Sequence, residues 1–140
     1  MRQQINMISL GVKDIEKSKD FYEKGLSWKA AKSSKTNYRL YDLGSFFMGL
    51  YPMAAFEEDT NLVYEATEFK GFTLSINAHS MEEVDEIMNQ VEQIGGTIIK
   101  FGEEVSWGGY RGYFKDLDDY LFEVVFNPFW KLNKDGKLML

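Results

Sequence analysis

The stretch Asp116-Leu117-Asp118-Asp119-Tyr120-Leu121-Phe122-Glu123-Val124 decides the fold, because it begins as an acidic turn and continues as an aromatic and aliphatic strand. The same pattern occurs earlier, in Asp42-Leu43-Gly44-Ser45-Phe46-Phe47-Met48-Gly49-Leu50. A constant offset of 74 residues separates positions 42 and 116, and also positions 49 and 123. Self-similarity at a fixed offset is the sequence signature of a repeated structural unit. The chain therefore consists of two similar modules.

The first module is expected over residues 4–52. Residues 4–12 alternate between apolar and polar side chains, which predicts a half-buried strand. Asp14 is a suitable N-cap for a helix that runs to about Glu23. Short strands are expected at residues 28–33, 37–41 and 45–51. The order of elements in this module is βαβββ.

The second module repeats this order over residues 71–126. A strand from Gly71 to Ala78 precedes a capping box formed by Ser80 and Glu83, and the helix that follows ends at Gly95-Gly96. Strands are expected at residues 97–101, 110–115 and 120–126.

The two modules are expected to form one domain of residues 1–140, with a linker at residues 53–70 and a C-terminal tail at residues 127–140. The linker has no clear period, so it is either a plain surface connection or a loop that faces a ligand. The apolar Phe129 and Trp130 predict that the tail packs on the core or on a partner subunit.

Composition excludes several classes of protein. The chain of 140 residues is 44% hydrophobic and 16% aromatic, as expected of an ordered globule. A net charge of −6 argues against a nucleic-acid partner, which requires a basic face. The absence of cysteine excludes disulfides and thiolate metal sites. No long apolar run or signal region is present, so we expect a cytoplasmic protein with no membrane partner.

Two segments carry a resemblance to a known superfamily. Residues 12–22, Val-Lys-Asp-Ile-Glu-Lys-Ser-Lys-Asp-Phe-Tyr, and residues 109–123, which end in Asp-Leu-Asp-Asp-Tyr-Leu-Phe-Glu, resemble the vicinal oxygen chelate superfamily of glyoxalases, bleomycin-resistance proteins and extradiol dioxygenases. Leu117 and Asp119 replace the proline and glycine of the usual turn. The resemblance implies an α+β fold, in which two tandem βαβββ modules form a curved mixed sheet around a cleft with the helices outside. It also implies a homodimer.

The same resemblance locates the positions at which related proteins bind a metal ion. These positions correspond to Met7, Gly49, Thr73 and Glu123. Only Glu123 is a competent ligand, and one carboxylate cannot hold a catalytic metal. The single histidine, His79, lies just before the second helix. We therefore expect no metal and no other cofactor.

Glu123 is the strongest candidate site residue, because it lies in a strand of aromatic and aliphatic residues. It is either a general base or the partner of a nearby cation such as Arg39 or Arg111. Strand parity places Met7, Ser9, Thr73, Ser75 and Asn77 on the face expected to bind a ligand. Trp107, Tyr110, Tyr113 and Arg39 are further candidates, but the pattern does not decide which residues of 37–41 and 110–115 face the cleft. Trp107 could equally be a packing residue in a hairpin bend.

The leading functional hypothesis is metal-independent binding of a small, partly apolar or aromatic organic ligand, as in the bleomycin-resistance proteins. The alternative is a metal-independent isomerase or lyase with Glu123 as base and Arg39 or Tyr113 as electrophilic partner. A metal-dependent glyoxalase-like enzyme would require ligands from outside the four usual positions.

Overall fold

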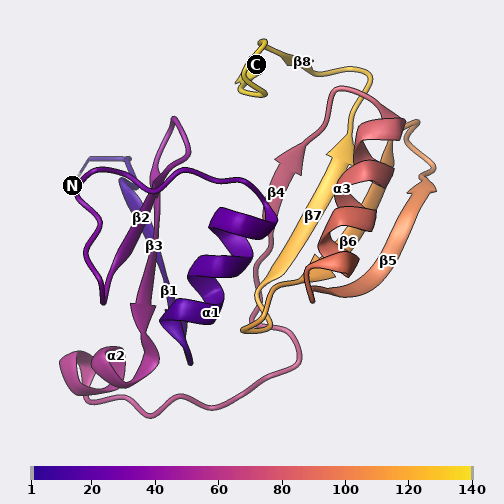
Figure 1. Ribbon diagram of the computed structural model, residues 1–140. Helices are drawn as coiled ribbons and strands as arrows, with labels where there is room; N and C mark the ends of the chain where they lie inside the picture. Colours follow the sequence, from indigo (N-terminus) through magenta and orange to yellow (C-terminus); the bar gives the residue numbers. More distant parts are fainter. Residues whose placement is uncertain (1, 140) are drawn as a thin grey trace. The chain divides into compact units, whose positions relative to one another are not determined.

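A computed structural model describes residues 2–139 of the chain. The chain divides into two compact units, with the boundary between Ala66 and Thr67 (Figure 1). Each unit has its own sheet and its own helices, and each is described separately below.

The first unit contains a three-stranded sheet. Its elements are β1 (Met7–Val12), α1 (Ile15–Asp20), the π-helical turn η1 (Phe21–Gly25), β2 (Arg39–Asp42), β3 (Phe47–Pro52) and α2 (Met53–Thr60). The strand order is β1-β3-β2, with β1 parallel and β2 antiparallel to β3.

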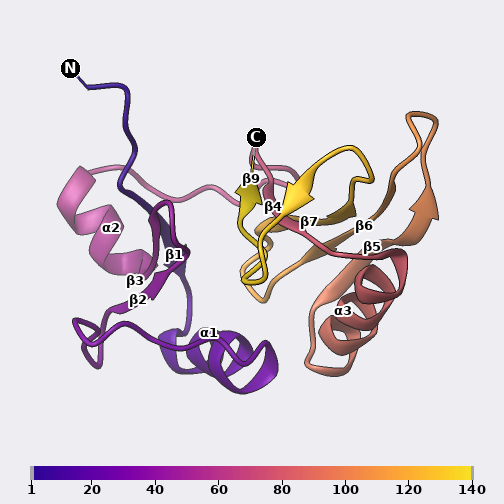
Figure 2. The ribbon, with the colours of Figure 1, turned by 90° about the horizontal axis from the view of Figure 1, so that it is seen from above.

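The two faces of this sheet are covered by different helices. Leu10 and Val12 of β1 and Leu50 of β3 are buried on the α1 side, together with the aromatic rings of Phe21 and Tyr22. Removing these side chains from water supplies the main stabilisation of the unit, at about 1.5–3 kcal/mol for each fully buried aliphatic or aromatic side chain. Figure 2 shows α1 and α2 on opposite sides of the sheet.

The predicted helix start at Asp14 is confirmed, since Asp14 Oδ1 accepts hydrogen bonds from the amides of Glu16 and Lys17 at 3.1 Å. The end of this helix differs from the prediction, because the α-helix gives way to the π-helical turn at Phe21.

The strand predicted at residues 28–33 is wrong, because only an isolated bridge between Ala30 and Tyr41 forms there. The hydroxyl of Ser34 explains the interruption. It accepts a hydrogen bond from the amide of Leu40 at 3.0 Å and donates one to the carbonyl of Leu40 at 3.2 Å. A side chain thus takes the amide of Leu40, while the carbonyl of Leu40 also accepts from the amide of Ala31 at 2.7 Å, so the pairing of this segment with β2 stays local.

The segment after β3 also differs from the expected structureless connection, because Met53–Thr60 forms the helix α2. The sequence Met-Ala-Ala-Phe-Glu-Glu contains good helix formers and follows a proline, which is a common helix start. Asn61, in the left-handed conformation with φ 56°, ends the helix.

The second unit contains a four-stranded mixed sheet. Its elements are β4 (Leu74–Asn77), α3 (Met81–Gln93), β5 (Thr97–Glu104), β6 (Tyr110–Lys115), β7 (Leu121–Phe126), β8 (Lys131–Leu132) and β9 (Leu138–Met139). The strand order is β4-β7-β6-β5, with β4 parallel to β7 and the other pairs antiparallel. The short strands β8 and β9 pair with each other.

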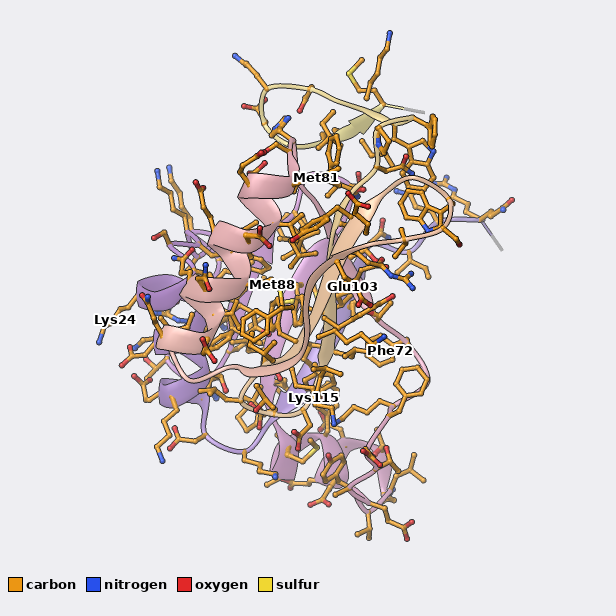
Figure 3. The ribbon with its side chains drawn as sticks, turned by 90° about the vertical axis from the view of Figure 1, so that its right-hand side faces the viewer. Lys24, Phe72, Met81, Met88, Glu103 and Lys115 are labelled. Carbon is orange, nitrogen blue, oxygen red and sulfur yellow. The ribbon has the colours of Figure 1, made fainter. Side chains whose placement is uncertain are left out.

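Helix α3 covers one face of this sheet, and the core lies between them. Met88 points from α3 toward the strands, where it is fully buried (Figure 3). Below the helix, the rings of Phe114 and Phe122 stack with centroids 4.9 Å apart. The predicted cap is present: Ser80 Oγ accepts from the amide of Glu83 at 3.1 Å, and the Glu83 carboxylate accepts from the amide of His79.

The C-terminal tail returns to the hairpin between β5 and β6. The ring of Phe129 lies against Gly108, where a Cβ added to the glycine would be 3.6 Å from it. Phe129 nevertheless remains 73% exposed.

The predicted α+β class is confirmed by these elements. Within residues 2–139, no helix combines the length and the apolar character needed to cross a membrane.

Candidate functional site

The candidate site lies on the face of the second sheet that α3 does not cover, which we call the polar face. In β7, Phe122 and Val124 turn toward α3, and their neighbours Glu123 and Val125 point the opposite way. The polar face therefore carries the side chains of Ser75, Asn77, Arg111, Tyr113 and Glu123.

Glu123 lies at the centre of the polar face, directly opposite Ser75 on β4 and Tyr113 on β6. The Ser75 hydroxyl donates to Oε2 at 2.8 Å, and the Tyr113 hydroxyl donates to Oε1 at 2.9 Å. The side chain is 17% exposed. Each carboxylate oxygen thus has a neutral donor from a flanking strand, which fixes the position of the carboxylate.

Arg111 supplies positive charge beside this carboxylate. Its Nη1 lies 3.6 Å from Oε1 of Glu123, and its guanidinium lies 5.2 Å from the centroid of the Tyr113 ring. The distance to Glu123 is too long for a good hydrogen bond, so the pair is held by charge and by the cation–π contact. The Arg111 side chain is 36% exposed and can be reached by a solute.

Tyr113 is held in its neutral form. Burial is the main cause of its raised pKa, and the hydrogen bond to Glu123 and the negative charge of that carboxylate raise the pKa further. Tyr113 is therefore a hydrogen-bond donor at neutral pH.

The remaining predicted residues of this unit occupy different positions. Thr73 precedes β4 and donates to the carbonyl of Leu121 at 3.2 Å. Tyr110 lies on the α3 side of the sheet, where its hydroxyl donates to Asp85 of α3 at 2.9 Å. Trp107 folds over Gly109 in the β5–β6 hairpin, so that a Cβ at Gly109 would collide with its ring.

In the first unit, Met7 and Ser9 lie on the sheet face away from α1. Ser9 is opposite Gly49, in the same arrangement as Ser75 and Glu123 in the second unit. Met7 Sδ accepts a hydrogen bond from the Tyr38 hydroxyl at 3.3 Å.

Arg39 lies on the other face of this sheet, since it is paired in register with the buried Leu50. Its Nε is 3.1 Å from Oε1 of Glu23 in η1. This contact is an ion pair and not a hydrogen bond, because among the described residues the buried Nε has no hydrogen-bond partner of acceptable angle. The structure therefore pairs Arg39 with Glu23 of its own unit.

Sequence reasoning missed an aromatic cluster on the face of the first sheet that carries Ser9 and lies away from α1. The rings of Tyr38 and Tyr51 are 6.0 Å apart, and those of Tyr51 and Phe56 are 4.9 Å apart, both edge to face. Phe56 comes from α2, which was expected to be a structureless linker. Its i and i+3 spacing from Met53 was the signal available in the sequence.

The residues at the four family metal positions do not fit a metal site. Gly49 has no side chain, Met7 offers a thioether, and the Thr73 hydroxyl donates to a backbone carbonyl. Only Glu123 offers an anionic oxygen, and both of its oxygens already accept hydrogen bonds. In residues 2–139, no group of three or more His, Cys, Asp or Glu side chains is arranged to hold a metal ion.

Comparison with known proteins identifies the family. The family model described as Glyoxalase/Bleomycin resistance protein/Dioxygenase superfamily matches residues 4–124. The chain belongs to this superfamily. The resemblance that the sequence suggested is confirmed, and the matched range includes residues 12–22 and 109–123. Among curated proteins, none matches the chain significantly.

Several solved structures resemble this chain over nearly its whole length. A glyoxalase-related enzyme from Fulvimarina pelagi is 27% identical, with a TM-score of 0.87 and 99% coverage of both chains. A hypothetical protein from S. aureus is 29% identical, with a TM-score of 0.78 and coverage of 91% of this chain and 95% of that one. Lactoylglutathione lyase from Agrobacterium tumefaciens shares the fold at 17% identity, with a TM-score of 0.68 and coverage of 95% and 100%.

Proposed function

We propose that this glyoxalase-superfamily protein binds a small, partly apolar or aromatic organic molecule without a metal ion, through the polar face of its second sheet. The observation that carries the proposal is that Glu123 offers the one carboxylate among the four family metal positions and that neighbouring side chains hold it in place. Its oxygens accept from Ser75 at 2.8 Å and from Tyr113 at 2.9 Å. One carboxylate held in this way is a fixed hydrogen-bond acceptor, and it falls short of the three protein ligands that a catalytic metal site uses.

The neighbouring groups suit a polar part of the ligand. Arg111 offers a partly exposed guanidinium, and the Tyr113 ring beneath it offers an apolar surface. A few polar groups that converge on an apolar surface are typical of small-molecule sites.

A metal-independent isomerase or lyase is the second candidate. It is favoured by the contact of the neutral Tyr113 with Glu123, because a carboxylate and a phenol in contact can exchange a proton with a substrate. In this reaction class Glu123 would take the proton and Tyr113 would stabilise developing negative charge on the substrate. Arg39, which pairs with Glu23, would take no part.

Glu123→Gln separates the two candidates. The substitution keeps the shape of the side chain and an oxygen acceptor but removes the base. A compound found by thermal-shift screening of the wild type should bind the variant with affinity within about tenfold of wild type if the protein is a binder. If the wild type converts the compound, the protein is an enzyme. Loss of turnover in the variant then shows that the reaction requires Glu123.

We also propose that the protein is a homodimer. The edge strand β5 supports this proposal, because its Ile99 and Phe101 are both exposed large apolar side chains. Light scattering on the purified chain tests it.

A further inference from the structure

The C-terminal tail, residues 127–139, presents two aromatic side chains to solvent (yellow in Figure 1). Phe129 is 73% exposed and Trp130 is 47% exposed, although the Phe129 ring lies against Gly108 of the β5–β6 hairpin. Large aromatic side chains that remain together in water are typical of a surface that another molecule covers. The tail therefore has the character of an interface.

The same tail is basic, although the whole chain is acidic. Residues 127–139 contain Lys131, Lys134 and Lys137 and one aspartate, Asp135, which gives the tail a charge of +2 in a chain of net charge −6. All three lysines are exposed, and within residues 2–139 none of them forms an ion pair. An aromatic surface with positive charge is complementary to an apolar surface with negative charge.

A pocket with an apolar lining lies beside α2, and we call it the α2 pocket. It has a volume of about 230 Å³ and is lined mainly by Met53, Phe56, Leu62, Val63 and Tyr64. None of its lining residues belongs to a strand, and Leu62 and Val63 are both largely exposed. An apolar cavity of about 150 Å³ can hold benzene, so the α2 pocket has room for one aromatic side chain.

The α2 pocket lies in the most acidic part of the chain. Residues 53–66 contain Glu57, Glu58, Asp59 and Glu65 but no lysine, arginine or histidine, which gives a charge of −4. All but Glu57 are exposed. Opposite charges around two apolar surfaces steer the surfaces together and fix their register. The tail and the α2 pocket are thus complementary in both charge and polarity.

We propose that the tail of one copy of the chain docks on the α2 pocket of a second copy. Trp130 enters the pocket, and Lys131 faces the acidic side chains at the end of α2, with Glu58 as its partner. In a two-fold symmetric dimer each copy gives its tail and receives the other tail, so the contact forms twice. The contact adds to the proposed homodimer and uses no residue of β5, so the two proposals can fail separately.

A second copy fits the tail better than an anionic membrane does. The exposed Glu103 and Glu104 lie at the end of β5, in the hairpin that Phe129 touches, and they would face the same negatively charged lipids as the tail lysines. The α2 pocket, in contrast, offers both the apolar space and the negative charge that the tail requires.

Sedimentation equilibrium at physiological salt measures the Kd of self-association and tests the contact. Trp130→Ser should raise the Kd roughly thirtyfold, because an aromatic anchor is lost. Lys131→Glu should raise it roughly tenfold, and adding Glu58→Lys to that variant should restore it to within about threefold, because the pair forms again with its charges exchanged. Lys29→Glu is the matched control, since it makes the same charge change at an exposed lysine away from both surfaces. It should change the Kd less than about twofold.

An unchanged Kd in both Trp130→Ser and Lys131→Glu would overturn the proposal. If Phe101→Ser weakens association in that case, the homodimer forms through β5 without the tail. A wild-type chain that is monomeric up to millimolar concentration would also overturn the tail contact. Binding of that monomer to vesicles of phosphatidylserine and phosphatidylcholine would then assign the tail to a lipid surface.

Disulfide trapping tests the geometry of the contact, because the chain has no cysteine of its own. Val63→Cys places a thiol at the α2 pocket, and Met139→Cys places one on β9 opposite Lys131. The two variants are purified separately and mixed with oxidised glutathione, and mass spectrometry identifies covalent dimers that join them. These dimers should form at least about tenfold faster than when Ile5→Cys, at an equally accessible position outside the pocket, replaces Val63→Cys.

Equal trapping rates with the pocket cysteine and the control cysteine would contradict the docking of the tail on the α2 pocket. A disulfide that forms within one chain carrying both Val63→Cys and Met139→Cys would show that the tail docks on its own copy, which also overturns the proposal.

Discussion

The hydroxyl of Tyr113 donates a hydrogen bond of 2.9 Å to Oε1 of Glu123, its cross-strand neighbour in the β6–β7 pair. Ser75 meets the other carboxylate oxygen from β4. Three strands that are separate in sequence are thus joined through one side chain. For the ligand proposed to bind the polar face, this arrangement means that the carboxylate need not be ordered when the ligand arrives.

Tyr113→Phe should lower the free energy of unfolding by about 1 kcal/mol, because a partly buried hydrogen bond to a carboxylate is lost. Urea unfolding of the variant and the wild type measures the difference. Tyr38→Phe is a suitable control, since its hydroxyl bonds only to the weak acceptor Met7 Sδ in the structure. That control should change stability by less than about 0.5 kcal/mol. Equal losses in the two variants would contradict the role given to Tyr113.

The buried Tyr41 should make stability depend on pH in the alkaline range. Burial raises the pKa of Tyr41 above its ordinary value of 10.0, and the charge of Glu23 and its hydrogen bond raise the pKa further. The unfolded chain therefore loses this proton first, so the contribution of Tyr41 is complete below pH 10 and is lost as the pH rises above it. The loss cannot exceed about 1.4 kcal/mol per pH unit for one proton.

Urea unfolding at pH 8 to 11 checks this prediction with the wild type and Tyr41→Phe. The variant should lose stability less steeply above pH 10, although Tyr110 and Tyr113, whose pKa values are also raised, leave it some slope. If the free energy of unfolding falls with pH in parallel for the two proteins, Tyr41 does not contribute to the pH dependence of stability.

Asp119 should not tolerate a β-branched residue. It has φ of 64°, in the turn where Asp116 Oδ1 accepts from the amides of Asp118 and Tyr120 at 2.9 Å. Asp119→Val should destabilise the protein by about 1–2 kcal/mol, because the left-handed conformation is costly for such a side chain. Asp119→Gly should be more stable than Asp119→Val by at least that amount. Thermal unfolding of the two variants measures the difference, and equal melting temperatures would contradict it.

The sequence predicted the helices and strands whose signals are local. Asp14 and Ser80 mark the helix starts because a short polar side chain before an apolar stripe caps free amides. The alternation of Thr73, Ser75 and Asn77 is also a local signal, because a strand places every second side chain on one face.

The parts that the sequence did not predict depend on contacts between distant residues. Strand parity could not tell which face Arg39 takes, and the structure pairs it with Glu23 in a π-helical turn. The parity of Tyr110 likewise became clear only from its hydrogen bond to Asp85. Helix α2 was missed because Met53 and Phe56 pack above Gly11, a contact that joins residues 42 positions apart in the sequence for Met53.

The most direct measurement for the central claim is thermal unfolding with added Zn²⁺, Ni²⁺, Mn²⁺ and Fe²⁺, for the wild type and Glu123→Gln, together with the metal content of protein purified without chelator. A cation that binds only the folded chain at 100 times its Kd would stabilise it by about 2.7 kcal/mol and raise the melting temperature. We predict no such rise and no stoichiometric metal. A dose-dependent rise in the wild type that Glu123→Gln abolishes would contradict the metal-independent account and make Glu123 a metal ligand.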